Sequence, residues 1–341
     1  MAAPTLETAI RPIVTEKRHA GGSQMFVVGG ESLIDLKEKP IKDGVMPMTA
    51  HAGGSPMNCA IALKRLGHDT GFLCPISEDK FGTMILDPLK EAGVKVLLKK
   101  RVKEPTTLAV VSDDGKGNPR YQFYRHADRA FSKEGLIEAL PRKIELFQFG
   151  GFCPIEAYDA RAWMETAKVA AAMGATISID PNVRPAVITD MAAYKQRLGR
   201  MLDLAHIVKV SDEDLDYLEK GKPLEAHAGA LLARSNVKLV VITRGKEGSL
   251  AFTREARAES PIYPAKKGGD NVGAGDTLMA GMLTWLRDHR ALAPEKLDKL
   301  SGDKLGEMLW FGAVAAGINC SRVGANPPSR AEVDAALAKK R

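Results

Sequence analysis

Short apolar runs alternate with longer stretches of helical periodicity along most of the chain. The first run, residues 25–30, ends in glycines, as expected of a buried strand followed by a turn. Later runs are separated by amphipathic stretches at 160–173, 192–204 and 224–233. This alternation predicts an α/β fold with a mainly parallel sheet covered by helices on both faces. The later runs that predict strands are 107–111, 121–124, 145–149, 176–180, 206–210, 239–243 and 249–252.

Helices are also predicted outside this alternation. Residues 55–67 begin with Ser55 and Pro56, which suit an N-cap and a first helical turn, and they end at a glycine. A second helix is predicted over 81–92, although Pro88 argues against an unbroken one. The C-terminal half is mostly helical, with periodic stretches at 275–289, 303–319 and 330–339.

Two segments, 36–52 and 97–126, interrupt the pattern. They contain short strand signals, charged residues and turn sequences, but no convincing helical periodicity. They predict a small antiparallel flap at the edge of the main sheet, of the kind that closes over a substrate and excludes water. Residues 1–23 lack the apolar core of a secretory signal, so we expect a poorly ordered extension before a single domain over 24–341.

Composition excludes several classes of protein. An apolar fraction of 45% and a charged fraction of 27% are typical of a soluble globular protein, and no apolar stretch is long enough to span a membrane. The four cysteines are scattered without a C-x-x-C pair, which argues against a zinc or redox motif and favours a cytoplasmic location. The net charge of +7 is spread along the chain rather than clustered with aromatics, so nucleic-acid binding is not expected.

The most informative stretch is 270–277, which contains Gly273-Ala274-Gly275-Asp276 and leads directly into an apolar helical run. Small residues let the backbone approach an anion, and amides at a helix start point their positive ends at it. An acid beside such a cradle is what phosphoryl transfer to a hydroxyl requires. The alternative is an ordinary helix cap. The chain has neither a P-loop nor a G-x-G-x-x-G motif.

Two early patches carry groups suited to neutral hydroxyls. Gly53 and Gly54 would let the backbone approach a ligand, and Asn58 would lie on the first turn of the next helix, where its amide both donates and accepts. Asp35 lies just beyond the first strand, at the sheet edge where α/β folds bind ligands. The alternative for each patch is a turn with a structural role.

Three later segments also follow predicted strands, and their groups suit phosphates. Segment 180–185 supplies Arg184, a fixed cation. Segment 209–214 supplies Lys209 and acids that could order the waters of a magnesium ion, although Ser-x-x-Asp is also a helix start. Segment 243–248 could lie against a nucleotide or form a hairpin turn. Together with the early patches, these segments predict an acceptor pocket beside a donor pocket.

Two of these motifs resemble the signatures of a known family. The early Gly53-Gly54-x-x-x-Asn58 and the late Asp270-x-x-Gly273-Ala274-Gly275-Asp276 resemble, in order and separation, those of the ribokinase-like (PfkB) carbohydrate kinases, and the likeness runs from Met25 to Val333. Within the family, the chain resembles the bacterial fructokinases most, with the 2-keto-3-deoxygluconate kinases as the nearest competitor. The further segments that carry this resemblance are 30–35, 127–129, 180–185, 208–211 and 324–328.

The resemblance implies a three-layer αβα sandwich with a small β lid, and an enzyme that transfers the γ-phosphate of ATP to a sugar hydroxyl. The acceptor implied is D-fructose, giving fructose 6-phosphate. Asp276 would deprotonate the hydroxyl, and Gly273, Ala274 and Gly275 would form the anion hole. We expect the dipole of the following helix to keep Asp276 ionised and weakly basic. The residues implied to hold the sugar are Asp35, Gly53, Gly54, Asn58, Arg129 and Arg184.

Two alternatives remain within the resemblance. A sugar acid such as 2-keto-3-deoxygluconate would need additional cations near the acceptor to bind its carboxylate, and Arg125, His126 and Arg129 are candidates. A non-catalytic homologue that binds sugar is the other alternative, and the intact Asp276 and anion hole argue against it.

The resemblance also implies cofactors and a partner. The family often has Asn-x-x-Glu where this chain has Ser211-x-x-Asp214, so either Asp214 or its neighbour Glu213 would organise Mg²⁺ through water. Asp270 is suitably placed for a monovalent cation such as K⁺. Lids of this family often pair between subunits, which suggests a homodimer. The residues expected to lie along ATP are Lys209, Ser211, Thr243, Gly245, Gly248 and, near the adenine, Asn319.

Overall fold

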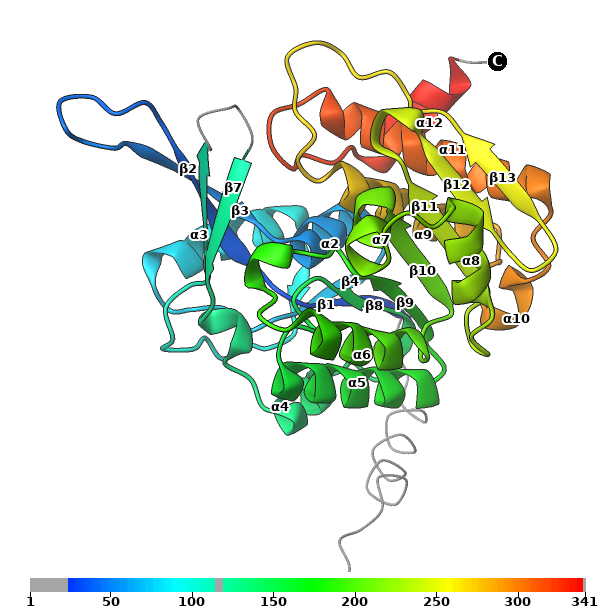
Figure 1. Ribbon diagram of the computed structural model, residues 1–341, viewed down its shortest axis with the longest axis horizontal. Coiled ribbons are helices and arrows are strands. Elements are labelled where there is room, and N and C mark those ends of the chain that lie inside the picture. Colours follow the sequence, from blue (N-terminus) through cyan, green and yellow to red (C-terminus); the bar gives the residue numbers. More distant parts are fainter. Residues whose placement is uncertain (1–23, 114–118, 340–341) are drawn as a thin grey trace, which may run out of the picture.

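The structure is a computed structural model that describes residues 24–113 and 119–339. The expected N-terminal extension, residues 1–23, lies outside the described part. A nine-stranded sheet forms the centre of the molecule, and a four-stranded sheet projects from one side of it (Figure 1). The order of the large sheet is β13-β12-β11-β10-β9-β8-β1-β4-β5.

The large sheet is parallel from β5 to β11, and its other edge, β11-β12-β13, is antiparallel. Its inner strands are almost wholly buried, as expected of a parallel sheet covered on both faces. The strands are β1 (Met25–Gly29), β4 (Thr70–Leu73), β5 (Lys95–Val96), β8 (Ile144–Gly150), β9 (Thr176–Asp180), β10 (Ile207–Ser211), β11 (Leu239–Thr243), β12 (Ser249–Phe252) and β13 (Arg257–Ser260).

Helices cover both faces of this sheet and form one hydrophobic core on each. Within β1, Phe26 and Val28 belong to one core, while Met25 and Val27 belong to the other, as the alternation of strand side chains requires. This is the predicted three-layer αβα sandwich. The first core contains α2 (Ser55–Arg65), α3 (Lys80–Ala92), α9 (Ala274–Asp288), α10 (Pro294–Leu297), α11 (Gly302–Cys320) and α12 (Arg330–Ala338); the second contains α4 (Lys133–Ala139), α5 (Ala157–Ala172), α6 (Met191–Leu202), α7 (Asp212–Leu218) and α8 (Leu224–Leu232).

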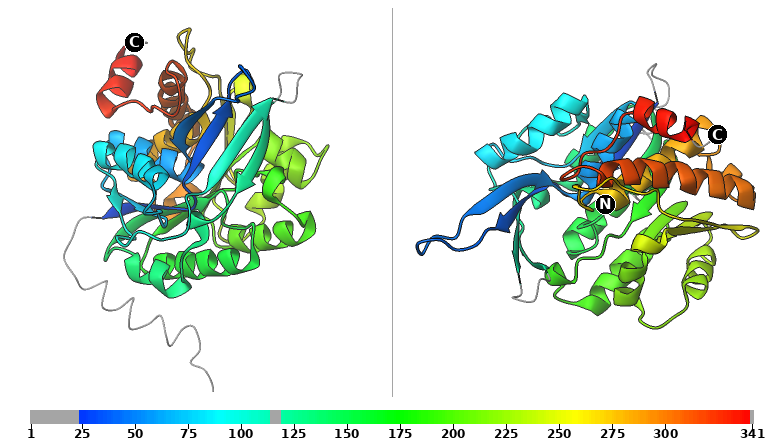
Figure 2. Two further views of the ribbon diagram at one scale, coloured as in Figure 1. Left: turned by 90° about the vertical axis from the view of Figure 1, so that its left-hand side faces the viewer. Right: turned by 90° about the horizontal axis from the view of Figure 1, so that it is seen from above.

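The smaller sheet, which we call the lid, has the order β3-β2-β6-β7. The right-hand view of Figure 2 shows β2 and β3 extending beyond the edge of the main body. The prediction of an antiparallel flap was wrong for the central pair: β2 and β6 are parallel, because each enters the lid from the main domain in the same direction. The lid strands are β2 (Leu33–Glu38), β3 (Met48–Gly53), β6 (Leu108–Asp113) and β7 (Pro119–Tyr124).

Most predicted elements are present, with ends that shift by a few residues. The runs at 176–180, 239–243 and 249–252 coincide with β9, β11 and β12. Pro88 lies inside α3 without ending it. The short strands β4, β5 and β13 and the short helices α4, α7 and α10 were not predicted. Within the described residues, none of the helices has the length and hydropathy needed to cross a membrane.

Candidate active site

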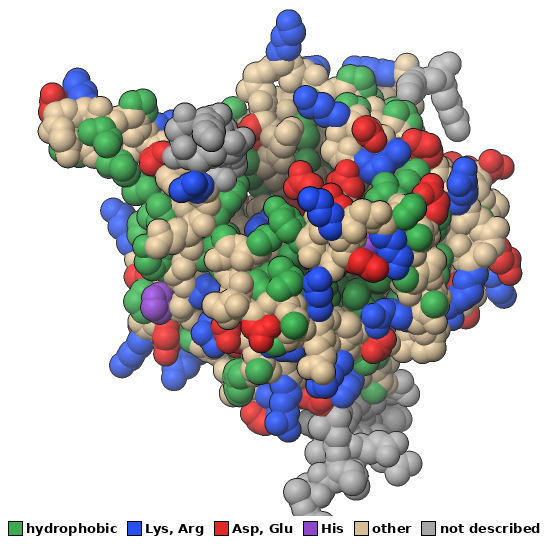
Figure 3. All heavy atoms as spheres, viewed as in Figure 1, with side chains coloured by type: hydrophobic (Ala, Val, Ile, Leu, Met, Phe, Trp, Pro, Cys, Tyr) green, Lys and Arg blue, Asp and Glu red, His purple; other side chains and the backbone are tan. Residues whose placement is uncertain are grey.

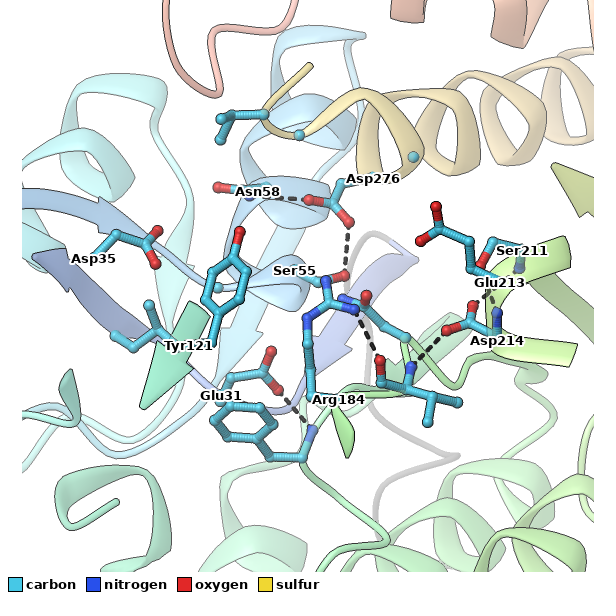
Figure 4. Close-up of a pocket in the computed structure, with 18 of the residues that line it drawn as sticks. Glu31, Asp35, Ser55, Asn58, Tyr121, Arg184, Ser211, Glu213, Asp214 and Asp276 are labelled. Atoms are coloured by element: carbon cyan, nitrogen blue, oxygen red, sulfur yellow. Dashed lines mark hydrogen bonds between the residues drawn. The ribbon is translucent and has the colours of Figure 1, made fainter. Parts of the chain in front are cut away.

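A cleft of about 820 Å³ lies between the lid and the carboxyl ends of the central strands (Figure 4). Because parallel strands all end at this edge, loops far apart in the sequence bring their polar groups to one place. The cleft is lined by most of the site residues predicted from the sequence, namely Asp35, Gly54, Asn58, Arg184, Lys209, Ser211, Glu213, Asp214, Gly273, Ala274, Gly275 and Asp276.

Asp276 lies in the first turn of α9 and is held by two side chains of α2. Its Oδ1 accepts a hydrogen bond from Ser55 Oγ at 2.6 Å, and its Oδ2 accepts one from Asn58 Nδ2 at 2.9 Å (Figure 4). The two sequence signatures therefore meet at a single carboxylate. We predicted Ser55 to cap α2, but Gly54 is the N-cap and Ser55 is the first helical residue, which frees its hydroxyl for Asp276.

Burial controls the protonation of Asp276. It raises the pKa of the carboxyl above its ordinary value, and the hydrogen bond from Ser55 and the charge of Lys209 only partly counteract this effect. The expectation that the helix start would keep this acid weakly basic was therefore wrong, because loss of solvation outweighs the favourable dipole. A carboxylate with a raised pKa is a better proton acceptor than an exposed one.

The two glycines before Asp276 leave little room for a side chain. Gly273 caps α9 in the left-handed region with φ 73°, and a Cβ there would come within 2.9 Å of the Cβ of Ala325. A Cβ on Gly275 would lie 3.0 Å from Nζ of Lys209. The Lys209 ammonium thus faces the first turn of α9, where free amides also point their positive ends. The Lys209 ammonium and these amides therefore lie together where an anion bound in the cleft would contact both.

Lys209 is held in place by a buried ion pair with Asp180. Its Nζ lies 2.9 Å from Asp180 Oδ2, and both residues are buried. Burial raises the pKa of Asp180 to about 6, and Lys209 lowers it in turn. Burial works to lower the pKa of Lys209, but Asp180 and the nearby Asp214 and Asp276 raise it more, so the ammonium stays charged.

The two candidate magnesium residues occupy different positions. Asp214 is buried, and its two oxygens accept hydrogen bonds from the backbone N–H groups of Val183 and Ser211. Together with Ser211 it forms the capping box of α7, the structural alternative considered for this motif. Glu213 is exposed and extends into the cleft (Figure 4). Of the two acids, Glu213 has its carboxylate free for a solvated ion.

The lid and the loop after β9 supply Asp35 and Arg184. Asp35 lies on β2, and burial raises the pKa of its carboxyl. A Cβ on Gly53, in the neighbouring strand β3, would lie 2.8 Å from Asp35 Oδ2, so Gly53 makes room for this side chain. Arg184 donates from Nη1 to the carbonyl of Val183 at 3.0 Å, and its guanidinium points into the cleft (Figure 4).

Three predicted site residues bind other parts of the protein instead of lining the cleft. Arg129 pairs with Asp159 of α5 at 3.2 Å. Asp270 accepts hydrogen bonds from the backbone N–H groups at positions 272 and 324, each at 2.9 Å. Asn319 is fully buried; it donates to the carbonyl at 272 at 2.8 Å and accepts from the amide at 326. Asp270 and Asn319 thus fix the loops around the start of α9.

The predicted nucleotide residues after β11 lie beside the cleft without lining it. Thr243 ends β11 and pairs in register with Ser211 of β10, which does line the cleft. Gly245 and Gly248 form the following turn, both with positive φ. A Cβ on Gly248 would come within 2.1 Å of the carbonyl oxygen of Ser260, so this glycine is required by the turn itself.

Sequence reasoning missed two side chains of the site. Ser55 was interpreted only as a helix cap, yet its hydroxyl contacts Asp276. Glu31 stands in the same motif as Asp35 but was not singled out, although it is buried and lines the cleft (Figure 4). Its position directly after a strand and a glycine was the available signal.

Comparison with known proteins agrees with this geometry. Residues 23–332 match the model of the pfkB family carbohydrate kinases. The chain is 34% identical to a fructokinase of Rhizobium leguminosarum bv. trifolii, over 82% of this chain and 85% of the relative. It resembles the crystal structure of fructokinase with bound ATP from Xylella fastidiosa, with a TM-score of 0.80, 27% identity, and coverage of 93% and 98% of the two chains.

A putative ribokinase II from E. coli, solved in complex with ATP and Mg²⁺, has the same fold, with a TM-score of 0.77 at 20% identity over 93% of this chain and 100% of the other. The family match covers nearly all of the described residues, including both signatures and the cleft between them. The chain therefore belongs to the pfkB family of carbohydrate kinases, enzymes that transfer a phosphoryl group to a sugar hydroxyl.

Proposed function

We propose that this protein is an ATP-dependent fructokinase that converts D-fructose to fructose 6-phosphate. The observation that carries the proposal is the Asp276 carboxylate, held between Ser55 and Asn58 and facing the cleft at the start of α9. Asp276 accepts the proton of the primary hydroxyl as that oxygen attacks the terminal phosphorus in line. Because the transition state of phosphoryl transfer is loose, most of the acceleration comes from positioning and charge stabilisation.

The acceptor half of the cleft favours a neutral sugar. Asp35, Gly54 and Asn58 offer a carboxylate, an open backbone and an amide for hydroxyl groups. Two of the three cations named as candidates for binding a sugar acid are engaged elsewhere: Arg125 pairs with Asp128 and Asp159, and Arg129 also pairs with Asp159. This pairing supports fructose over 2-keto-3-deoxygluconate.

ATP is the proposed donor, with its terminal phosphates at the start of α9. There the amides at 273–275 and the Lys209 ammonium would stabilise negative charge on the transferred group. Arg184 supplies a further cation to the same cleft. The turn at 243–248 borders the proposed path of the nucleotide, and Asn319 contributes by fixing the loop at 272.

The residues present fit a magnesium ion bound to the phosphates of ATP. Glu213 offers a hard carboxylate oxygen donor in the cleft and would hold the ion through water, which a solvated Mg²⁺ prefers. When bound, the ion neutralises phosphate charge. We also propose that Asp270 orders a monovalent cation site, because its carboxylate ties the loop at 324 to the start of α9. Replacing K⁺ by a bulky organic cation in the assay would test that site.

We propose that two copies pair through their lids. The β2–β3 connection carries exposed apolar side chains, among them Ile41 and Val45, which are 65% and 63% exposed. Figure 3 shows hydrophobic side chains along this projecting arm. Analytical ultracentrifugation of the protein and of an Ile41→Lys variant tests the pairing; a wild type that sediments as a monomer at micromolar concentration would disprove it.

A coupled assay of ADP release tests the function. We expect kcat/KM to be highest for D-fructose among fructose, ribose, 2-keto-3-deoxygluconate and adenosine. A preference for 2-keto-3-deoxygluconate would replace the proposal by the sugar-acid kinase. Binding of fructose by calorimetry without any ADP release would instead indicate a non-catalytic sugar-binding protein.

A further inference from the structure

A buried acid that the proposed mechanism does not use stands where the main sheet joins the lid. Glu31 lies between β1 and β2, at the carboxyl end of a central strand, and it is 4% exposed. The surface that it retains belongs to the cleft, on the acceptor side with Asp35 and Arg184 (Figure 4). An ionisable side chain is seldom buried without an opposite charge or a hydrogen-bond partner, so the environment of Glu31 needs explanation.

The backbone around Glu31 is shaped to hold its carboxylate. Its Oε2 accepts a hydrogen bond from the backbone N–H of Phe152 at 2.9 Å. The carboxylate lies against Gly151, where a Cβ would come within 2.2 Å of Oε2, and Gly151 has φ 56°. A Cβ on Gly54 would lie 2.8 Å from the backbone oxygen of Glu31. Both glycines have positive φ; Gly151 makes room for the Glu31 carboxylate, and Gly54 makes room for the Glu31 backbone.

Among the residues that the structure describes, no charged group forms an ion pair with Glu31. Arg125 and Asp128 follow β7, and their charges act on Glu31 in opposite directions. Arg125 is already paired with Asp128 at 2.6 Å. The thiols of Cys74 and Cys153 are buried, which raises the pKa of each and keeps both neutral. Arg184 is a further cation that lines the same cleft.

We propose that Glu31 is a specificity residue of the sugar site, whose carboxylate accepts a hydrogen bond from a hydroxyl of a neutral sugar and repels the carboxylate of a sugar acid. The proposal rests on the proposed function of the cleft. One oxygen is fixed by Phe152, so the group is oriented before the sugar binds. A charged acceptor gives a stronger hydrogen bond than a neutral one, while two carboxylates in a partly dry cleft repel each other.

The protonation of Glu31 makes this selectivity depend on pH. Burial raises the pKa of Glu31 from 4.5 to about 7. The backbone amides of Phe152 and of Glu31 itself oppose this rise, Asp128 adds to it, and Arg125 opposes it. Below this pKa the side chain is neutral, and a sugar acid is no longer repelled. Above it the carboxylate is ionised. The preference for fructose over 2-keto-3-deoxygluconate therefore rises as the pH increases through about 7.

Glu31→Gln in the full-length protein tests the proposal, because the amide keeps the shape and can still accept from Phe152 N–H. We expect kcat/KM for fructose at pH 8 to fall on the order of tenfold, through KM rather than kcat, while KM for ATP is unchanged. The ratio of kcat/KM for fructose to that for 2-keto-3-deoxygluconate should fall and lose its dependence on pH between 6 and 8.5.

Gly151→Ala provides a matched second variant, because it displaces the carboxylate without removing its charge. It should weaken fructose binding while the pH dependence persists, and thermal unfolding reports whether the variant is folded. If Glu31→Gln keeps the wild-type sugar ratio and its pH dependence, the specificity role is overturned and the kinase assignment stands. If the wild type phosphorylates neither sugar, the proposed function itself fails.

Discussion

The two walls of the cleft hold their functional groups in different ways. On the wall formed by α2 and α9, Asp276 is fixed by two side-chain hydrogen bonds, and Lys209 behind it is fixed by Asp180. On the lid wall, Asp35 is half-buried, and no other side chain of the described residues donates a hydrogen bond to it. The first wall is organised before any ligand binds, as catalysis by charge stabilisation requires. The second leaves its acid free for hydroxyl groups of the substrate.

The strongest test of this contrast is Asp276→Asn. The amide keeps the hydrogen-bonding shape but cannot accept the proton, so we expect kcat to fall on the order of a hundredfold or more. Circular dichroism and the melting temperature should show an intact fold, and fructose should still bind. Sugar-dependent ATP turnover near the wild-type rate would refute the assignment of Asp276 as the base.

The pH dependence of the wild type sharpens the same test. Protonated Asp276 cannot accept the proton of the sugar hydroxyl, so kcat falls when the pH drops below the pKa of Asp276. Because burial raises this pKa, the fall in kcat should occur at a higher pH than it would with an exposed aspartate. The acid limb of the kcat profile should be absent from the residual activity of Asp276→Asn.

Lys209→Met is expected to have the next largest effect. Removing the ammonium takes away charge stabilisation at the start of α9, so we expect kcat to fall about tenfold to a hundredfold. It also leaves Asp180 buried without its partner, which destabilises the fold. The double variant with Asp180→Asn is the control: it should recover thermal stability but not kcat. Recovery of both would show that Lys209 has only a structural role.

The sequence predicted the wall formed by α2 and α9 more fully than the rest of the site. The sequence contains Gly273, Gly275, Asp276 and Asn58 in two short motifs, and their resemblance to the signatures of the family indicated that the two motifs meet in one site. It could not choose between Glu213 and Asp214, because a capping box and a metal ligand share the same Ser-x-x-Asp pattern.

Features that depend on long-range pairing were not accessible from the sequence. The parallel pairing of β2 with β6 joins segments far apart in the chain, and short strand signals carry no information on direction. The raised pKa of Asp276 depends on how deeply neighbouring helices bury it, which periodicity does not report. The strands β9 and β11 were predicted accurately because β11 is an almost continuous apolar run and β9 alternates isoleucine with polar residues, and both have clear ends.

On the lid wall, Asp35→Ala is predicted to weaken fructose binding about tenfold, with little change in affinity for ATP, because the lost group is a charged acceptor for sugar hydroxyls. Isothermal titration calorimetry with fructose and with an ATP analogue separates the two effects. Asp43→Asn, at the exposed end of the lid, is the control and should bind both ligands as the wild type does. A selective loss of nucleotide affinity in Asp35→Ala would show that the two halves of the cleft are exchanged.

Arg129→Ala is expected to have the smallest effect. It tests whether the sugar site on the lid side of the cleft includes Arg129. Family resemblance suggests contact with the sugar, but the Arg129 side chain is 40% exposed and pairs with Asp159 outside the cleft. Arg129 itself is exposed to solvent, which weakens its charge interaction, and the buried Asp159 stays paired with Arg125 when Arg129 is removed. We therefore expect KM for fructose to change less than about twofold. A tenfold rise in KM for fructose without a change in melting temperature would mean that Arg129 reaches the sugar when it binds. The acceptor pocket would then extend beyond β2 to the segment after β7.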